Sequence, residues 1–332
     1  MRILVTGIAG FLGSNLAHAL ITMGHDVVGC DNLIGGYSDN VPNMANVAYI
    51  DCNEFDSMRR LMGGVDVVYH CAAEAYEGLS VCSPHRIVRS VVAMTASVLS
   101  AAASSKVKRF VYLSSMARYG AGKVPFHETT SVPKPQDPYG ISKLAAEALV
   151  RNICDVHGIE WLIAVPHNIY GPYQRYTDPY RNVAAIFVNQ MLQGKQPIIY
   201  GTGHQRRCFS YVSDCVGPLL KMIEADSGLV VNIGPDDEFI TILELAERIA
   251  GILSFRLDPV FVSRRPQEVQ DANCSADLAR AVLGYSPKVS LDLGLRLLVD
   301  WIRSRGPKPF EYHLPIEIMS ERTPGTWAHK LY

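Results

Sequence analysis

Paired cysteines are missing from this sequence. Its eight cysteines are Cys30, Cys52, Cys71, Cys82, Cys154, Cys208, Cys215 and Cys274. None of them forms a C-x-x-C pair, and no group of cysteines and histidines has the spacing of a zinc site. This absence argues against a zinc module or a redox motif, and we expect no metal. The cysteines are typical of reduced, mostly buried thiols in a cytoplasmic protein.

Long apolar runs and an excess of charge are also missing. The apolar start from Met1 to Val5 is too short for a signal peptide and runs directly into a glycine turn. No run approaches the roughly 20 residues that a membrane span needs. The formal net charge is −1, with both signs scattered along the chain. We therefore expect neither a membrane nor a nucleic acid as partner, and any affinity for an anion must come from a local site.

Strand and helix patterns alternate along the first half of the chain. The 332 residues, 48% of them hydrophobic, are enough for one large domain or two interlocked ones. Apolar runs predict strands at 2–6, 25–30, 47–50, 65–73, 109–113 and 159–165, and helical periodicity predicts helices at 14–21, 86–104, 139–157 and 183–193. This alternation predicts an α/β protein with a doubly wound parallel sheet, in which ligands bind at the carboxyl ends of the strands.

A glycine-rich turn follows the first predicted strand. Gly7, Gly10 and Gly13 form a G-x-x-G-x-x-G pattern, and a helix comes directly after it. Glycines allow a tight turn in which backbone N–H groups approach a pyrophosphate, and the helix N-terminus adds partial positive charge. The order strand, glycine turn, helix therefore predicts a dinucleotide site.

Polar and small residues at the next strand ends indicate which dinucleotide is bound. Asp31 follows the second strand, where a carboxylate binds both ribose hydroxyls and repels a 2′-phosphate, which favours NAD over NADP. Asp51 follows the third strand and is a weaker candidate for contact with adenine. Ala72 and Ala73 follow the fourth strand, where small side chains let a cofactor lie flat. His70, in the same strand, is expected to be structural.

Tyr139 and Lys143 are four residues apart in a predicted helix, so they share one face of it. A lysine ammonium beside a tyrosine lowers the pKa of the phenol from about 10 and allows it to act as a base. On spacing alone, a packed tyrosine and a solvated lysine are the more common explanation of this pattern. The preceding dinucleotide motifs favour the catalytic interpretation.

Several motifs occur together in one order: the glycine turn, Asp31, the segments 70–73, 114–120 and 138–143, and further segments at 168–172 and 201–207. Over about residues 1–305 the sequence resembles the extended short-chain dehydrogenase/reductases that modify nucleotide-sugars, such as UDP-glucose (UDP-galactose) 4-epimerase. The resemblance implies a Rossmann domain with a smaller C-terminal α/β substrate lobe, and a catalytic set of Ser115, Tyr139 and Lys143. It also implies tightly held NAD, contacted by Gly7, Gly10, Phe11, Leu12, Gly13, Asp31, Asn32, Asp51, Cys52, Ala72, Ala73, Tyr139, Lys143 and Pro166.

The resemblance also indicates the reaction. Dehydratases and decarboxylases of this superfamily carry carboxylates just before the tyrosine that is Tyr119 here, but this chain has Met116 and Ala117. Epimerisation at carbon 4 through a 4-keto sugar is therefore expected: Tyr139 takes the hydroxyl proton and Ser115 bonds the same oxygen. The alternatives are a 4-keto reductase or dehydrogenase, a 4,6-dehydratase, and a non-catalytic NAD-binding protein.

A second resemblance, to GDP-mannose 3,5-epimerase, covers residues 134–172 and 204–234. That family needs an additional cysteine and lysine as acid and base. The cysteine position is Ala117 here, and no lysine lies between Lys143 and Lys195. We therefore interpret this likeness as shared ancestry or nucleotide handling.

The second half of the chain supplies the expected substrate contacts. By resemblance, Ser115, Tyr139, Asn168, Arg207, Arg265 and Glu268 bind a nucleotide-diphosphate sugar. Guanidinium groups suit a diphosphate because they bind it bidentately. Arg175, in a polar loop, is an equal candidate for a phosphate contact or for a solvated loop arginine.

The resemblance also divides the chain. It predicts an NAD-binding domain over 1–165, a substrate lobe over 166–306 that is interlaced with it, and a C-terminal extension over 307–332 with no family counterpart. Proline and scattered aromatics in the extension predict an extended path on the surface. Relatives pair through helices like those expected at 86–104 and 139–157, so a homodimer is expected.

Overall fold

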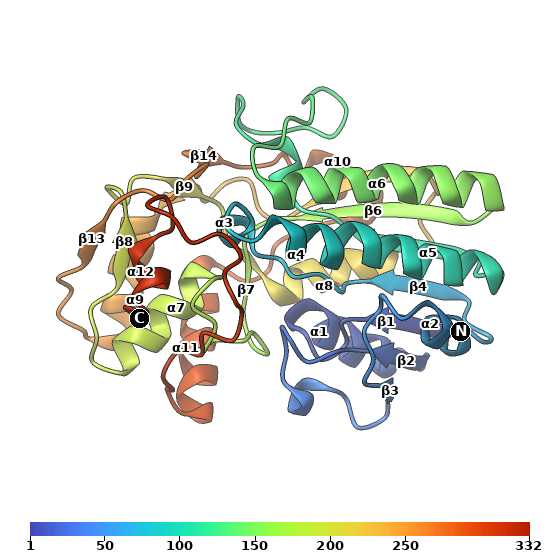
Figure 1. Ribbon diagram of the computed structural model, residues 1–332, viewed down its shortest axis with the longest axis horizontal. Coiled ribbons are helices and arrows are strands. Elements are labelled where there is room, and N and C mark those ends of the chain that lie inside the picture. The colour runs from blue at the N-terminus through green and yellow to red at the C-terminus, as the bar shows by residue number, and fades with distance from the viewer.

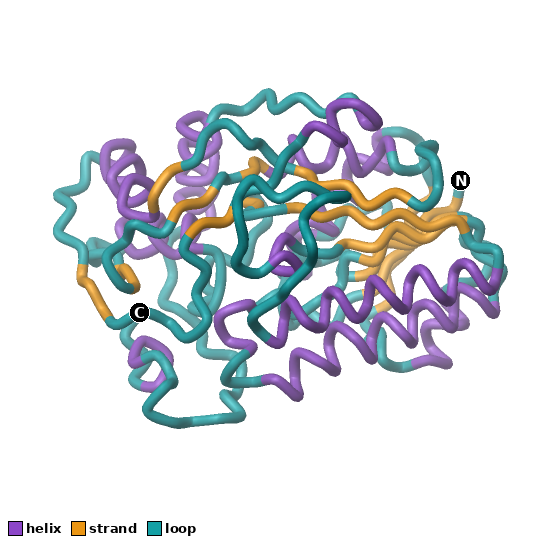
Figure 2. Tube along the Cα trace, turned by 90° about the horizontal axis from the view of Figure 1, so that it is seen from above, coloured by secondary structure: helices purple, strands orange, loops and turns teal.

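A seven-stranded parallel sheet forms the centre of the molecule (Figures 1 and 2). The computed structural model describes all residues, 1–332. The strands are β1 (Arg2–Thr6), β2 (Asp26–Cys30), β3 (Asn46–Ala48), β4 (Val67–His70), β5 (Arg109–Leu113), β6 (Glu160–Pro166) and β11 (Leu229–Ile233). Their order across the sheet is β11-β6-β5-β4-β1-β2-β3. The predicted doubly wound fold is confirmed.

Helices cover both faces of the sheet, which explains why its central strands are almost continuously apolar. One layer contains α2 (Phe55–Leu61), α4 (Pro84–Val88), the π-helical turn η2 (Arg89–Ala93), α5 (Met94–Ser104) and α6 (Pro138–His157). The other contains α1 (Phe11–Thr22), α8 (Val212–Lys221) and α10 (Asp277–Leu283). Each layer buries its own hydrophobic cluster against the sheet.

The helical stretch Pro84–Ser104 corrects one expectation from the sequence. By length and composition it could cross a membrane. Half of its most apolar part is buried inside the molecule, because α5 packs between α2 and α6. A core helix of a large sheet meets the same criteria of length and composition, so the stretch is weak evidence for a membrane.

The second lobe is interlaced with the sheet. It contains α7 (Val183–Leu192), α9 (Ile242–Leu253), α11 (Leu291–Arg305) and the short strands β7 (Ile169–Tyr170), β8 (Ile198–Tyr200), β9 (Arg206–Arg207), β10 (Ser210–Tyr211), β12 (Ile240–Thr241), β13 (Val260–Val262) and β14 (Asp271–Ala272). Between these segments the chain returns to the first lobe, where β11 pairs with β6 and α8 packs against α1. The two lobes are therefore joined by several chain crossings, while α7, α9 and α11 bury a hydrophobic cluster of their own.

Two short helices, α3 (Glu77–Ser80) and η3 (Met116–Tyr119), lie where the lobes meet. A third, η1 (Ser38–Asn40), lies further out. The last element, α12 (Gly325–Ala328), belongs to the C-terminal extension. This extension runs back across both lobes, and Phe310, Leu314 and Trp327 are buried along it. The expected path on the surface is therefore wrong for these residues, since their apolar side chains fill gaps between the lobes.

Candidate functional site

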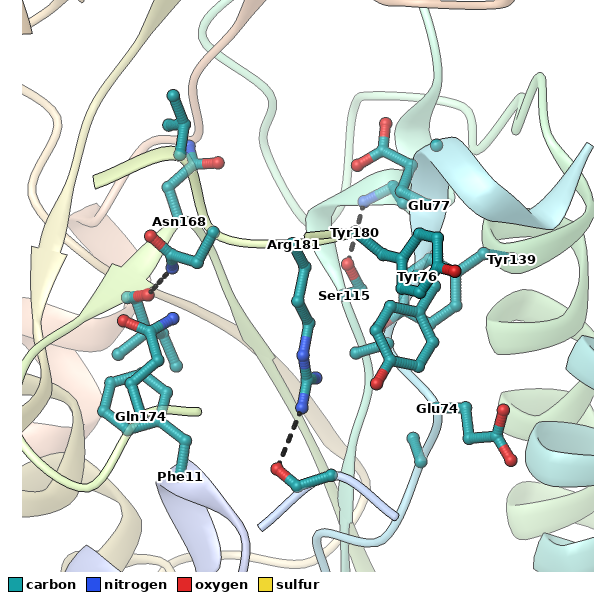
Figure 3. Close-up of a pocket in the computed structure, with 18 of the residues that line it drawn as sticks. Phe11, Glu74, Tyr76, Glu77, Ser115, Tyr139, Asn168, Gln174, Tyr180 and Arg181 are labelled. Atoms are coloured by element: carbon teal, nitrogen blue, oxygen red, sulfur yellow. Dashed lines mark hydrogen bonds between the residues drawn. The ribbon is translucent and has the colours of Figure 1, made fainter. Parts of the chain in front are cut away.

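A single cleft of about 440 Å³ lies at the carboxyl ends of the strands, between the two lobes. Both lobes and the last residue, Tyr332, line it. In the close-up, Tyr139, Glu77 and Tyr76 lie on one side, Asn168, Gln174 and Phe11 lie on the other, and Arg181 extends between them (Figure 3). The cleft is therefore where the fold class predicts a ligand.

The glycine turn between β1 and α1 forms the floor of the cofactor end. A Cβ on Gly13 would lie 2.1 Å from the carbonyl oxygen of Gly7, so only glycine allows this tight path into the helix. Gly7 has φ of +71° and packs directly on the backbone of Ala72. The N-terminus of the twelve-residue helix α1 thus faces the cleft with free backbone N–H groups.

Asp31 is held in place at the end of β2. One carboxylate oxygen accepts the N–H of Ala9 at 2.9 Å, and the other accepts the N–H of Leu33 at 2.7 Å. Burial raises the pKa of Asp31, while these backbone bonds oppose the rise. Each oxygen keeps a second lone pair, so the carboxylate is oriented and still able to accept from ribose hydroxyls.

Ser115, Tyr139 and Lys143 come together from two places in the chain, the N-cap of η3 and the helix α6. Ser115 follows β5 and caps η3, where its hydroxyl accepts the N–H of Ala117 at 3.2 Å. Tyr139 and Lys143 lie in the first two turns of α6 and are both buried. The ammonium of Lys143 donates to the carbonyl of Leu113 at 2.6 Å and lies 5.8 Å from the ring centroid of Tyr139.

The ionisation of this set differs from the sequence-based expectation. Burial is the largest influence on Tyr139 and raises the pKa of its phenol, while a hydrogen bond from Ser115 and the charge of Arg181 lower it. Burial also lowers the pKa of Lys143 to about 8. The expected lowering of the tyrosine pKa by Lys143 is therefore wrong for the protein alone, because desolvation outweighs a charge at this distance.

His70 is structural, as expected. Its Nδ1 lies 2.8 Å from the hydroxyl of Thr6, and its Nε2 lies 3.1 Å from the hydroxyl of Thr95. Burial lowers the pKa of His70 to about 3, so the ring stays neutral. It fills the space below the cleft and stays uncharged at working pH.

The expected substrate residues lie at the second-lobe end of the cleft. Arg265 donates to Glu268 at 2.7 Å, and its guanidinium lies 4.7 Å from the ring centroid of Tyr200. Arg207 donates from both Nη atoms to backbone carbonyls, which fixes the guanidinium and leaves Nε and one Nη2 hydrogen for a ligand. Asn168 donates to the carbonyl of Cys208 at 2.8 Å, so it also stabilises its own turn.

The predicted cofactor residues share this cleft, except one. Gly7, Gly10, Phe11, Leu12, Gly13, Asp31, Asn32, Cys52, Ala72, Ala73, Tyr139, Lys143 and Pro166 line it. Asp51 instead lines a polar neighbouring pocket that also contains Asn32 and Arg86. Asp51 turns away because its carboxylate accepts the backbone N–H of Asn53 at 2.8 Å. Its predicted contact with adenine has no support from this geometry.

Four charged residues that line the cleft were missed from the sequence: Glu74, Glu77, Asp137 and Arg181. Arg181 enters the cleft, although Arg175 was the candidate from the same loop. Arg175 donates to Glu311 at 2.7 Å and does not line the cleft, whereas Arg181 packs over the ring of Tyr76 at 4.9 Å. Glu77 is exposed in the cleft, and no hydrogen bond or ion pair engages its carboxylate. No pattern in the sequence distinguishes Arg181 or Glu77 from an ordinary surface charge.

The first-lobe side of the cleft fits a dinucleotide. The buried ammonium of Lys143 has three hydrogens and one protein acceptor, so two remain for hydroxyl groups of a ligand. Ala72 and Ala73 leave space beside it, and the α1 N-terminus offers N–H groups to a pyrophosphate. These are the contacts that the ribose and phosphates of NAD require.

Comparison with known proteins gives matches along most of the chain. The model of the NAD-dependent epimerase/dehydratase family matches residues 3–234. GDP-mannose 3,5-epimerase 1 of Oryza sativa subsp. japonica is 30% identical over 313 residues, which cover 92% of this chain and 82% of that protein. The dTDP-glucose 4,6-dehydratase of Streptomyces niveus is 33% identical over 319 residues, which cover 91% of this chain and 93% of that protein.

A solved structure is similar over the same extent. The UDP-glucose 4-epimerase of Thermotoga maritima, crystallised with UDP-glucose, is 32% identical and has a TM-score of 0.87. The match covers 92% of this chain and 99% of that one. Its identity and coverage are in the same range as those of the epimerase and dehydratase relatives, so similarity alone does not choose between their reactions.

Proposed function

This chain belongs to the NAD-dependent epimerase/dehydratase family, and on that basis we propose that it epimerises a nucleotide-diphosphate sugar at carbon 4. The predicted family membership is confirmed, and NAD is the cofactor of this family. When bound, NAD supplies a hydride acceptor and a positively charged ring. Every other part of the chemistry depends on residues of this chain.

Tyr139 would take the proton of the sugar 4-hydroxyl while carbon 4 loses a hydride, and Ser115 would bond the same oxygen. The hydride then returns to the opposite face of the 4-keto sugar and the proton returns from Tyr139, so the net reaction consumes nothing. Lys143 would orient a ribose through its two free hydrogens. The positive charge that accompanies the cofactor would oppose the effect of burial on Tyr139.

The choice of epimerisation over elimination rests on the two residues before Arg118 and Tyr119. The segment before Tyr119 places Met116 and Ala117 at the cleft, so no ionisable group occupies the positions from which relatives catalyse elimination. A reaction that moves one hydride and one proton off the sugar and back needs no second acid or base there. Arg207, Arg265 and Glu268 support a nucleotide diphosphate as the carrier of the sugar.

A second reaction is favoured by the carboxylate of Glu77. Its charge acts on both Tyr139 and Arg207, and it has no protein partner. A carboxylate in this position could move a second proton, as the loss of water by a 4,6-dehydratase requires. Glu77→Gln separates the two reactions, since it would abolish a dehydratase but leave an epimerase largely active.

Incubation of the purified enzyme with UDP-, GDP-, CDP- and dTDP-sugars, followed by NMR, tests the proposal. A 4-epimeric product at constant total sugar, with no net change in absorbance at 340 nm, is expected. A product that has lost water would instead identify a dehydratase. Stoichiometric consumption of added NADH or NADPH would identify a one-way reductase.

A further inference from the structure

The C-terminal extension, residues 307–332, lies outside the residues 3–234 that the family model matches. It is tied to both lobes. Its Glu317 accepts backbone N–H groups at the start of α4, and the N–H of Ile318 donates to the carbonyl of Cys82 at 2.8 Å. The extension is thus held on the first lobe before it crosses to the second.

At the cleft, the extension packs against Arg265. The ring of Trp327 is buried, and its Nε1 donates to the carbonyl of Pro179 at 3.2 Å. A Cβ on Gly78, in α3, would lie 3.0 Å from a guanidinium nitrogen of Arg265 and 3.3 Å from the ring of Trp327. A side chain at position 78 would therefore crowd the point where α3, the extension and the second lobe meet.

The last residues also fix Tyr200 in β8. The hydroxyl of Tyr200 bonds the hydroxyl of Thr326 and accepts a hydrogen bond from the hydroxyl of Tyr332 at 3.1 Å. The backbone N–H of Tyr332 is held in turn by the hydroxyl of Tyr312 at 3.0 Å. Arg265 lies over the ring of Tyr200 and is held separately by Glu268 at 2.7 Å.

Tyr332 itself lines the cleft beside Tyr200, Arg265 and Glu268. Two aromatic rings therefore lie next to the groups suited to a diphosphate and a ribose. A nucleoside joined to that diphosphate must lie beyond these groups, on the side opposite the sugar. A flat base is recognised well by aromatic side chains held rigidly in place.

We propose that the C-terminal extension completes the nucleoside end of the cleft and that Tyr332 contacts the nucleoside of the substrate. This inference rests on the proposed function, because it requires a nucleotide-diphosphate sugar as substrate. It assigns a binding role to a segment that the family match does not include.

Calorimetric titration of the NAD-loaded enzyme with UDP, GDP, CDP, dTDP and inorganic pyrophosphate tests the proposal. Tyr332→Ala should weaken the best nucleoside diphosphate about 5- to 10-fold and leave pyrophosphate binding within about twofold. Tyr332→Phe, which keeps the ring, should stay near wild type. Leu331→Ala is the matched control, because its side chain is exposed at the neighbouring position.

Unchanged affinity in Tyr332→Ala, with normal NAD content and melting temperature, would overturn the inference and leave the proposed function intact. An equal loss of pyrophosphate binding would also overturn it, since Tyr332 would then act only by positioning Arg265. If the wild-type enzyme bound none of the four nucleoside diphosphates, the proposed function itself would fail.

Discussion

Burial governs ionisation at the centre of the cleft, as Asp137 illustrates next to Tyr139. Its carboxylate begins α6 by accepting the N–H of Gly140 at 2.9 Å. Burial is the main cause that raises the pKa of Asp137 to about 7, and the nearby charge of Glu77 adds to it. A carboxyl with a raised pKa in the folded state binds more protons folded than unfolded. Stability therefore falls as pH rises from about 4 to about 7 and is constant above.

Asp137→Asn should flatten this dependence. The amide keeps an oxygen to cap α6 but carries no charge, so the variant should melt higher than wild type at pH 8. The wild type should lose on the order of 3 kcal/mol of stability across this range from Asp137 alone. Thermal unfolding of both proteins between pH 5 and 8 measures the difference. The exposed Asp56→Asn serves as control, and parallel curves for Asp137→Asn and wild type would contradict the assignment.

Tyr139 is the residue on which the proposed chemistry depends. Tyr139→Phe removes the hydroxyl and leaves the buried ring, so packing and cofactor binding should persist. We expect kcat to fall by at least about 10³-fold, because proton transfer by a positioned group commonly supplies factors of this size. NAD content of the purified variant, measured after denaturation, should match wild type. Substantial remaining turnover would refute the role of Tyr139.

At the scale of elements, a buried ion network joins α6 to η3. Glu147 of α6 is fully buried and accepts the hydroxyl hydrogen of Ser114 at 2.5 Å. Nε of Arg118, in η3, lies 3.0 Å from the same carboxylate, and Arg151 lies 3.3 Å from its other oxygen. The network therefore fixes Ser115, which follows Ser114, relative to the helix that carries Tyr139 and Lys143.

Glu147→Ala should destabilise the fold by about 3–5 kcal/mol, because it leaves the guanidinium of Arg118 buried without a counter-charge. Denaturant unfolding measures the loss. Asp300→Ala is a suitable comparison, since it breaks an exposed pair with Arg303 and should cost less than about 1 kcal/mol. Equal effects of the two substitutions would show that the network contributes no more than a surface pair.

At the scale of the whole molecule, the outer face of α4, α5 and α6 has no partner within the chain. Apolar or small side chains are exposed along it at Val88, Ala93, Ile141, Ala148 and Val156. We propose that two copies pair through this face, as the resemblance predicts. A continuous apolar helical surface is typical of a self-complementary interface.

Light scattering coupled to size exclusion should give twice the mass of one 36.5 kDa chain. Ala148→Glu should shift the protein towards a monomer, because it places a charge in the middle of the face without weakening the helix. Leu297→Glu makes the same kind of change on an exposed position of α11 in the other lobe and should leave the mass unchanged. A wild-type monomer would overturn the proposed dimer.

The sequence alone was sufficient for features that depend on neighbours in the chain. The glycine turn, the strand that ends at Asp31 and the pairing of Tyr139 with Lys143 on one helix all follow from local spacing, and the structure has each of them. The doubly wound parallel sheet also follows, because alternating strands and helices with short connections allow few arrangements. The lack of an ionisable group at Met116 and Ala117 also follows from the sequence, because it does not depend on how the chain folds.

Contacts between segments far apart in the sequence decided which charged residues line the cleft and how its central groups ionise. Arg181 rather than Arg175 faces the cleft because Glu311, 136 residues away, engages Arg175. Tyr332 reaches the cleft because its extension crosses both lobes, and the pKa of Tyr139 rises because the surrounding core excludes water. Desolvation and long-range pairing depend on which surfaces meet in three dimensions. Neither can therefore be predicted from the spacing of residues along the sequence.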